Sequence, residues 1–138
     1  MRSLSDYRGC VIRVAVAAVL LVALTASAAG AAGPTALTIT IWPDERKQTV
    51  QRYRLACAPA RGTLPRAAVA CARLTAGGPA LFRPPPPDQA CIEVYGGPQR
   101  AIVTGTVSGR NVWVSLRRRD GCEIERWRRL SFLLPVKV

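Results

Sequence analysis

Alternating apolar and polar residues mark two neighbouring stretches of the chain, Leu37–Trp42 and Val50–Cys57. A period of two predicts strands that bury one face. Pro43-Asp44 ends the first stretch and polar residues follow, so the two strands are expected to pair as an antiparallel hairpin. The side chains of the second strand expected to point inward are Gln51, Tyr53, Leu55 and Cys57.

Helical spacing replaces this alternation over Arg66–Thr75. Pro65 suits the start of a helix, and Gly77-Gly78 suits its end. One face of this helix recurs at spacings of three and four, and we expect it to be buried. The residues on that face are Ala67, Ala70, Cys71 and Leu74.

The C-terminal part of the chain repeats both periods. Ala101–Val107 and Asn111–Leu116 alternate on either side of a Ser108-Gly109 turn, which predicts a second hairpin. A short helix is expected over Glu123–Arg129, and the mostly apolar Leu130–Val138 is expected to be a last strand. The fold class predicted from these elements is α+β, with an antiparallel sheet of about five strands, one main helix and one short helix.

Prolines dominate the segment between the main helix and the second hairpin. Gly77–Asp88 contains Pro79 and the run Pro84–Pro87, so we expect neither helix nor central strand there. A polyproline-like spacer is predicted instead. Cys91–Pro98 follows as a short extended segment that ends in Gly-Gly-Pro.

The N-terminal segment has the pattern of a secretory signal peptide. Three arginines precede an uncharged run from Val14 to Ala32, and Ala26-Ser27-Ala28 fits an A-x-A cleavage site. We expect residues 1–28 to be removed, with cleavage after Ala32 as the second choice. Residues 29–36 are then a flexible N-terminus and residues 37–138 a single exported domain. The alternative is an uncleaved membrane anchor, because the run approaches the length of a spanning helix.

Cysteine and histidine content narrows the chemistry. Cys10 leaves with the signal, and the four cysteines that remain predict two disulfides whose pairing the spacing alone leaves open. The chain has no histidine and no Cys-x-x-Cys, so neither a zinc site nor another metal or cofactor is expected. Without histidine the usual general base is missing, so we do not expect an enzyme.

The expected mature chain is strongly basic. From residue 29 onward it has 17 Lys and Arg against 7 Asp and Glu, a net charge of +10. One interpretation is a secreted module that binds a polyanion on a cell surface and has no inhibitory activity. The other is an ordinary exported protein with scattered surface arginines. Nucleic acid is not an expected partner, nor is a stable membrane anchor once the signal is cleaved.

The segment around Cys91 is the main candidate for function. A stiff proline run leads into it, a half-cystine lies inside it and Gly-Gly-Pro ends it. A loop ordered before binding loses little entropy on association, which is what an inhibitor that mimics a protease substrate requires. An ordinary loop with a structural disulfide is the alternative. The loop residues are Ala90, Cys91, Ile92, Glu93, Val94, Tyr95 and Gly96.

Several short motifs resemble those of the Streptomyces subtilisin inhibitor-like family. The resemblance runs from about Leu37 to Phe132. The matching pieces are Cys57-Ala58-Pro59, Gly62–Pro65, Ala70–Leu74, Cys91 with Val94–Pro98, Val103-x-Gly105, Gly109-Arg110-x-Val112, and Asp120–Ile124 with Arg126-Trp127.

This resemblance implies a secreted inhibitor of extracellular serine proteases of the subtilisin or trypsin type. It implies the disulfides Cys57–Cys71 and Cys91–Cys122, and a homodimer that associates through the sheet face. It places the scissile bond between Glu93 and Val94, so that Glu93 is the P1 residue, which enters the S1 pocket of the protease.

Four features depart from the family pattern. Ile92 stands where a small residue or proline is common, and Glu93 stands where Met, Lys or Arg is common. An unpaired carboxylate is costly in an apolar pocket, so a glutamyl-specific protease becomes an alternative target. Leu64 replaces a common histidine, and a second glycine precedes Pro98.

Overall fold

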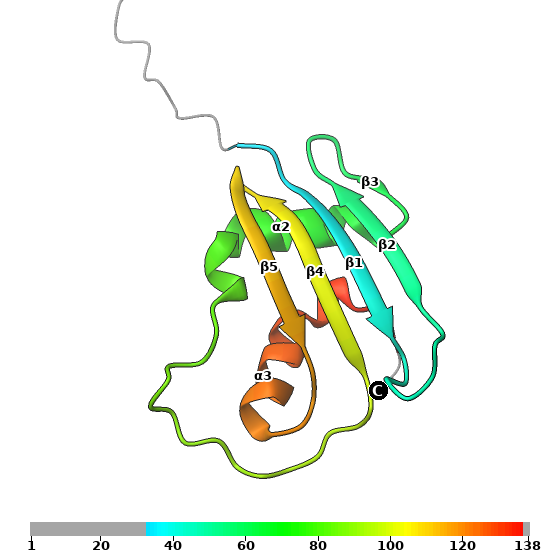
Figure 1. The fold of residues 1–138 in the computed structure, drawn as a ribbon. Coiled ribbons are helices and arrows are strands. Elements are labelled where there is room, and N and C mark those ends of the chain that lie inside the picture. The colour runs from blue at the N-terminus through cyan, green and yellow to red at the C-terminus, as the bar shows by residue number, and fades with distance from the viewer. Residues whose placement is uncertain (1–32, 137–138) are drawn as a thin grey trace, which may run out of the picture. The chain divides into compact units, whose positions relative to one another are not determined.

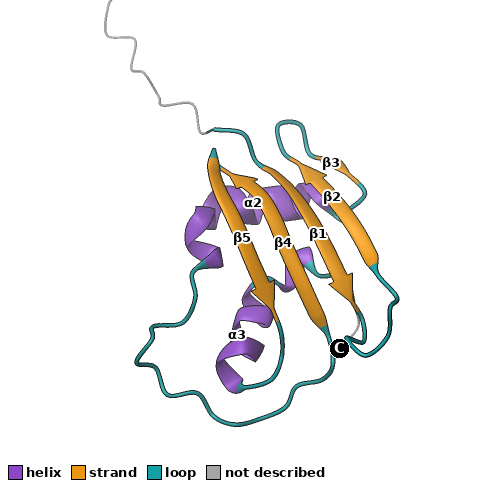
Figure 2. Cartoon of the chain, viewed as in Figure 1, coloured by secondary structure: helices purple, strands orange, loops and turns teal. Residues whose placement is uncertain are grey.

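A five-stranded antiparallel sheet organises the described part of the protein (Figures 1 and 2). The computed structural model describes residues 33–136, so the predicted signal peptide lies outside the described residues. The strand order is β3-β2-β1-β4-β5. The strands are β1 (Ala36–Trp42), β2 (Gln51–Ala56), β3 (Arg61–Gly62), β4 (Arg100–Val107) and β5 (Arg110–Leu116).

Register in the centre of the sheet follows from the alternating pattern. Leu37, Ile39 and Ile41 of β1 are all buried, and Ile39 lies opposite Tyr53 of β2 and Val103 of β4. A slip of one residue would turn all three apolar side chains of β1 to the other face, so burial fixes this register. Both predicted hairpins are confirmed.

Two helices and two 3₁₀ turns cover one face of the sheet (Figure 1). Helix α2 (Ala67–Gly77) buries Ala70, Cys71 and Leu74, which confirms the predicted face. Helix α3 (Gly121–Arg129) buries Ile124 and Trp127. The carboxylate of Asp120 caps α3 by accepting from the Glu123 amide at 2.9 Å, which explains why this helix begins earlier than predicted.

The predicted last strand is wrong. Residues 131–133 form the 3₁₀ turn η3 (Ser131–Leu133) instead. Leu130, Leu133 and Leu134 are all buried, and their spacing of three and four is helical. A run of mostly apolar residues is compatible with a strand and with a helical turn, so the pattern did not distinguish the two structures.

The sheet reaches five strands through a segment that the sequence predicts as loop. Arg61 and Gly62 form β3 and pair with Ala56 and Leu55 of β2. At Gly62, φ is +129°, and a Cβ atom there would lie 2.1 Å from the Arg54 carbonyl oxygen. This close approach requires glycine.

The proline-rich segment is also more ordered than predicted. Helix α2 ends at Gly77, and the 3₁₀ turn η2 (Gly78–Phe82) follows with Pro79 in its first positions. Phe82 is buried in the core, and this burial holds the turn against the sheet. Only the prolines from Pro84 onward lie in irregular chain.

Both disulfides pair as the family resemblance implies. Cys57–Cys71 joins the end of β2 to α2 with a Cα–Cα distance of 5.6 Å. Cys91–Cys122 joins the candidate loop to the first turn of α3 with a Cα–Cα distance of 5.4 Å. Among the described helices, none combines the length and apolar character needed to cross a membrane.

Candidate functional site

The candidate loop is the long connection between η2 and β4, and it passes beyond one end of the sheet beside α3 (Figure 1). Residues 90–95 are all exposed. Ile92 is 74% exposed, Tyr95 64% and Val94 43%, which is unusual for three large apolar or aromatic side chains within four residues. Neighbouring exposed apolar residues of this kind indicate a surface that binds another molecule.

The first arm of the loop is held by helix α3. The Arg129 guanidinium donates to the Arg83 carbonyl oxygen at 3.1 Å. Pro86 and Gln89 form a turn in which the Gln89 amide donates to the Pro86 carbonyl at 3.1 Å. Burial lowers the pKa of the Arg126 guanidinium, and the neighbouring Arg129 lowers it further. The disulfide at Cys91 completes this arm.

The centre of the loop is a tight turn around Glu93. The Gly121 amide donates to the Ile92 carbonyl oxygen at 2.9 Å, and the Val94 amide donates to the same oxygen at 3.1 Å. The second bond spans a single residue, as in a γ-turn, so Glu93 lies at the apex. Within the described chain, Glu93, Val94 and Tyr95 make no other backbone hydrogen bond.

The second arm is fixed by the segments that flank β1 and β5. The Gly96 amide donates to the Arg118 carbonyl at 2.7 Å, and the Glu45 amide donates to the Pro98 carbonyl at 2.8 Å. The Arg118 side chain donates to Gln99 Oε1 at 2.9 Å and lies over the ring of the buried Trp127. Arg118 therefore joins this arm of the loop to the core.

Two glycines let the loop lie close to its support. A Cβ atom at Gly121 would lie 2.5 Å from Ile92 Cγ1, and one at Gly96 would lie 2.8 Å from Ile124 Cδ1. Both distances are well inside van der Waals contact, so side chains at these positions would push the loop away from α3. Close packing of the loop on α3 therefore requires glycine at two positions, Gly96 in the loop and Gly121 in the helix.

The charges near the second arm are mostly paired. Glu45 lies 3.4 Å from Arg117 and 3.7 Å from Arg119. Hydrogen bonds from the side chain and backbone of Arg46 hold the pKa of Asp44 below its ordinary value. The pKa of Arg46 is raised, first by Asp44 and more weakly by neighbours that include Tyr95. Among the described residues, none forms an ion pair with Glu93.

One cluster of potential metal ligands lies beside the loop. It consists of Cys91, Asp120 and Cys122. The two sulfur atoms form a disulfide, and Asp120 Oδ1 already accepts from the Glu123 amide. The cluster is therefore accounted for by structural roles and offers no thiolate to a metal ion.

The structure brings together every loop residue that the sequence singled out, from Ala90 to Gly96. The supporting contacts of Gly121, Arg118 and Glu45 were missed. The bond that each of the three makes to the loop runs through a backbone amide or carbonyl, which residue type does not reveal, although Arg118 also contacts Gln99 through its side chain. Only the glycine at 121, placed at the start of a helix, was a signal that close packing is needed there.

Replacing Gly121 by alanine is expected to weaken any function of the loop about tenfold, equivalent to about 1.4 kcal/mol. The new methyl group clashes with Ile92 and displaces the turn around Glu93. Inhibition constants would be measured for Gly121→Ala, Ile92→Ala and the double variant. The penalty should vanish when Ile92 is already alanine. An equal penalty in both backgrounds would contradict the proposed contact.

Comparison with known proteins identifies a family whose sequence model matches this chain. The sequence model described as "Subtilisin inhibitor-like" matches residues 33–117, which include the whole candidate loop. No curated protein matches the chain significantly.

Among solved structures, one similar chain comes from the crystal structure of Streptomyces caespitosus sermetstatin in complex with Bacillus licheniformis subtilisin. The identity is 24%, the TM-score is 0.49, and the match covers 75% of this chain and 100% of that one. The family model is one of inhibitors, in agreement with the expectation that the chain is not an enzyme. Because this model matches more than half of the sequence, the chain belongs to the subtilisin inhibitor-like family.

Proposed function

We propose that this protein is a secreted inhibitor of an extracellular serine endopeptidase, with residues 90–96 as its reactive loop and Glu93–Val94 as the bond presented for cleavage. One observation carries the proposal. The three residues Glu93–Tyr95 are exposed and keep most of their backbone donors and acceptors free, while the chain on both sides is anchored. Free backbone groups on an ordered loop are what a protease cleft pairs with when it binds a substrate strand.

The anchors explain how such a loop would resist the protease. If the bond after Glu93 is cut, the new carboxyl end is still held by Cys91–Cys122 and by the Gly121 bond to Ile92. The new amino end is still held by the Gly96 bond to Arg118. Because neither end diffuses away, the cleaved bond is favoured to close again. The same anchors order the loop before binding, which removes an entropy cost from association.

Glu93 sets the class of target. Its carboxylate is exposed and forms no ion pair within the described chain, so it is available to a protease pocket. A pocket with cationic or donor groups would stabilise it, as a glutamyl-specific protease provides. An apolar subtilisin pocket would bury the charge unpaired, at a cost of several kcal/mol. The target is therefore a subtilisin-like protease that tolerates glutamate or a glutamyl-specific one.

Export and assembly complete the proposal. The signal pattern over residues 1–28 directs the chain out of the cell, and residues 37–138 form the inhibitory domain. An oxidising compartment agrees with the two disulfides. The homodimer implied by the family resemblance stays a prediction.

Titration against subtilisin, trypsin and a glutamyl endopeptidase would test this function. The secreted protein is expected to inhibit at least one of them at near-stoichiometric amounts. Slow cleavage at Glu93–Val94 should be visible when the inhibited complex is analysed by mass spectrometry. Degradation by all three proteases without a lag would contradict inhibition, and cleavage at another bond would contradict the assignment of P1.

A further inference from the structure

We propose that Arg118 is a positioning residue of the reactive loop, a role that rests on the inhibitory function proposed above. Together with Gln99, its side chain holds the arm that follows Glu93–Val94, and this favours resealing of a cut bond over hydrolysis. We call Arg118, Gln99, Gly97 and the ring of Trp127 the Arg118 clamp. The family resemblance does not imply this clamp, because Gly97 belongs to the Gly-Gly pair that departs from the family pattern.

Arg118 contacts the second arm of the loop at two points. It lies between β5 and α3, where its carbonyl oxygen accepts from the Gly96 amide at 2.7 Å. Its Nη1 donates to Gln99 Oε1 at 2.9 Å. Gln99 directly precedes β4, which begins at Arg100. One residue therefore supports the arm both near the scissile bond and at its entry into the sheet.

The guanidinium group of Arg118 is held in one place. Its carbon atom lies 5.9 Å from the centroid of the Trp127 ring, and Trp127 is buried in the core. Within residues 33–136, the buried Nε of Arg118 has no hydrogen-bond partner, and no ion pair includes this side chain. Because an unpaired buried donor is costly, the bond to Gln99 and the contact with Trp127 have to offset that cost. The side chain therefore serves the loop and no carboxylate of the described surface.

Gly97 gives the clamp room to close. Its φ is +126°, and a Cβ atom there would lie 2.4 Å from Gln99 Oε1 and 3.2 Å from Arg118 Nη1. The amide of Gln99 and the guanidinium of Arg118 thus pack directly against the Gly97 backbone. A side chain at this position would displace both groups, so the close approach requires glycine.

Two adjacent glycines create the need for such a support. Glycine has the greatest backbone freedom of all residues, and Gly96-Gly97 begins only two residues after Val94. Beyond Val94, the first backbone hydrogen bond is that of the Gly96 amide. The first arm is held covalently by Cys91–Cys122, whereas the second arm is held by hydrogen bonds. Order in the second arm therefore depends on the clamp.

The position of the Val94 amine decides between two reactions. In the acyl-enzyme of a serine protease, the Glu93 carbonyl carbon is bonded to the serine oxygen, and Val94 has left as a free amine. Attack by this amine reforms the peptide bond, breaks the ester and passes one proton through the general base of the protease to the serine oxygen. Attack by water gives the Glu93 carboxylic acid and leaves the loop cut. An amine held near the ester has a high effective concentration, which favours the first reaction.

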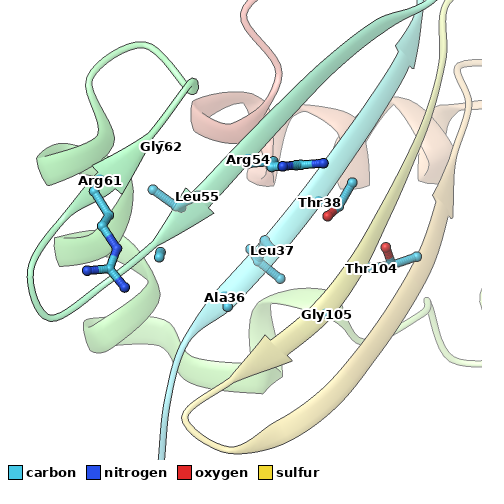
Figure 3. Close-up of a pocket in the computed structure, with 10 residues that line it drawn as sticks. Ala36, Leu37, Thr38, Arg54, Leu55, Arg61, Gly62, Thr104 and Gly105 are labelled. Carbon is cyan, nitrogen blue, oxygen red and sulfur yellow. The ribbon is translucent and has the colours of Figure 1, made fainter.

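The clamp is separate from the sheet face at which two copies are predicted to associate. The exposed arginines of that face are Arg52, Arg54 and Arg61. A groove of about 440 Å³ lies beside them at the beginning of β1 (Figure 3). The second arm enters β4 at Arg100, which pairs with Trp42 at the opposite end of β1. Arg118 packs over Trp127 of α3, so substitutions in the clamp are expected to leave association of copies unchanged.

Removing either partner of the side-chain hydrogen bond tests the clamp. Inhibitor already cut at Glu93–Val94 would be incubated with a catalytic amount of the protease that wild type inhibits. Mass spectrometry then measures the final ratio of cut to intact chain. Arg118→Met, which keeps apolar packing on Trp127, and Gln99→Leu are each expected to raise this ratio about fivefold. The double variant should raise it by the same factor, because the two side chains act through one bond.

Arg128→Met is the matched control, because it removes an exposed arginine from α3. Its ratio of cut to intact chain should stay within about twofold of wild type. Thermal unfolding and sedimentation verify the fold and the association state of each variant. A role in global stability alone would lower the melting temperature and leave the ratio unchanged below it. An unchanged ratio in Arg118→Met would overturn the proposal, as would additive effects in the double variant.

Hydrogen exchange of the Gly96 amide tests the clamp without any protease. In the intact free protein this amide is bonded to the Arg118 carbonyl, so loosening the second arm exposes it to water. Arg118→Met is expected to speed its exchange about fivefold and to leave the Gly121 amide, which is bonded to Ile92 in the other arm, unchanged. Unchanged Gly96 exchange would contradict the clamp itself, whereas a wild type that inhibits no protease would contradict the inhibitory function.

Discussion

Replacing Glu93 by methionine is expected to strengthen inhibition of subtilisin about a hundredfold, which corresponds to about 2.7 kcal/mol. The free protein loses nothing by the exchange, because Glu93 is exposed and has no ion-pair partner among the described residues. In the complex, a carboxylate that an apolar pocket must bury unpaired is replaced by a flexible apolar side chain that such a pocket accommodates. The inhibition constant for subtilisin measures the effect directly.

Inhibition of a glutamyl endopeptidase should move in the opposite direction. The same substitution removes the charge that such an enzyme recognises, so its inhibition is expected to fall by a comparable factor. Glu93→Gln separates the charge from the shape of the side chain. Asp88→Asn provides the matched control, because Asp88 is an exposed acid of the same loop and should affect neither protease. An unchanged profile for Glu93→Met would show that Glu93 does not enter the S1 pocket.

Removal of the Cys91–Cys122 disulfide is expected to convert the protein from an inhibitor into a substrate. The bridge closes a segment with a sequence separation of 31. Its loss should lower the free energy of unfolding by about 3.7 kcal/mol in the chain-entropy account. It should also release the end of the chain that carries Glu93, so that cleavage is no longer reversed. The Cys91→Ala/Cys122→Ala variant should therefore inhibit only briefly and then be degraded.

The second disulfide is the natural control for this experiment. Cys57–Cys71 has a sequence separation of 14 and joins β2 to α2, away from the reactive loop. Its removal should cost about 3 kcal/mol of stability by the same account. Denaturant unfolding would show similar losses for the two double variants, whereas time courses of inhibition below their melting temperatures would differ. Equal persistence of inhibition in both would contradict the role given to Cys91–Cys122.

Local patterns in the sequence were enough to predict most of the elements. Alternation in β1, β2, β4 and β5 reports burial of one face, and the helical spacing of Ala70, Cys71 and Leu74 reports the inner face of α2. These signals depend on residues within one turn or one pleat of each other. They fail where neighbouring residues are nearly all apolar, as at Leu133-Leu134, because such a run fits a strand and a helical turn equally well.

Contacts between segments that are distant in the sequence could not be predicted from local patterns. Strand β3 has only two residues, and it is recognised as a strand only by its pairing with β2. In the sequence it therefore resembled a loop. The segment from Gly78 to Phe82 forms a 3₁₀ turn that buries the Phe82 side chain in the core. In both cases the contact that decides the structure lies outside the window in which a pattern can be recognised.

The sequence by itself determined the family and the fold class and pointed to a candidate loop, because motif residues, periodicity and cysteine spacing depend on residue types. Only the tertiary structure showed which contacts besides the disulfide hold that loop, since the hydrogen bonds of Gly121, Arg118 and Glu45 to it run through backbone atoms. It also decided that Arg52, Arg54 and Arg61 share one face, because strand register, not distance along the chain, sets which side chains are neighbours.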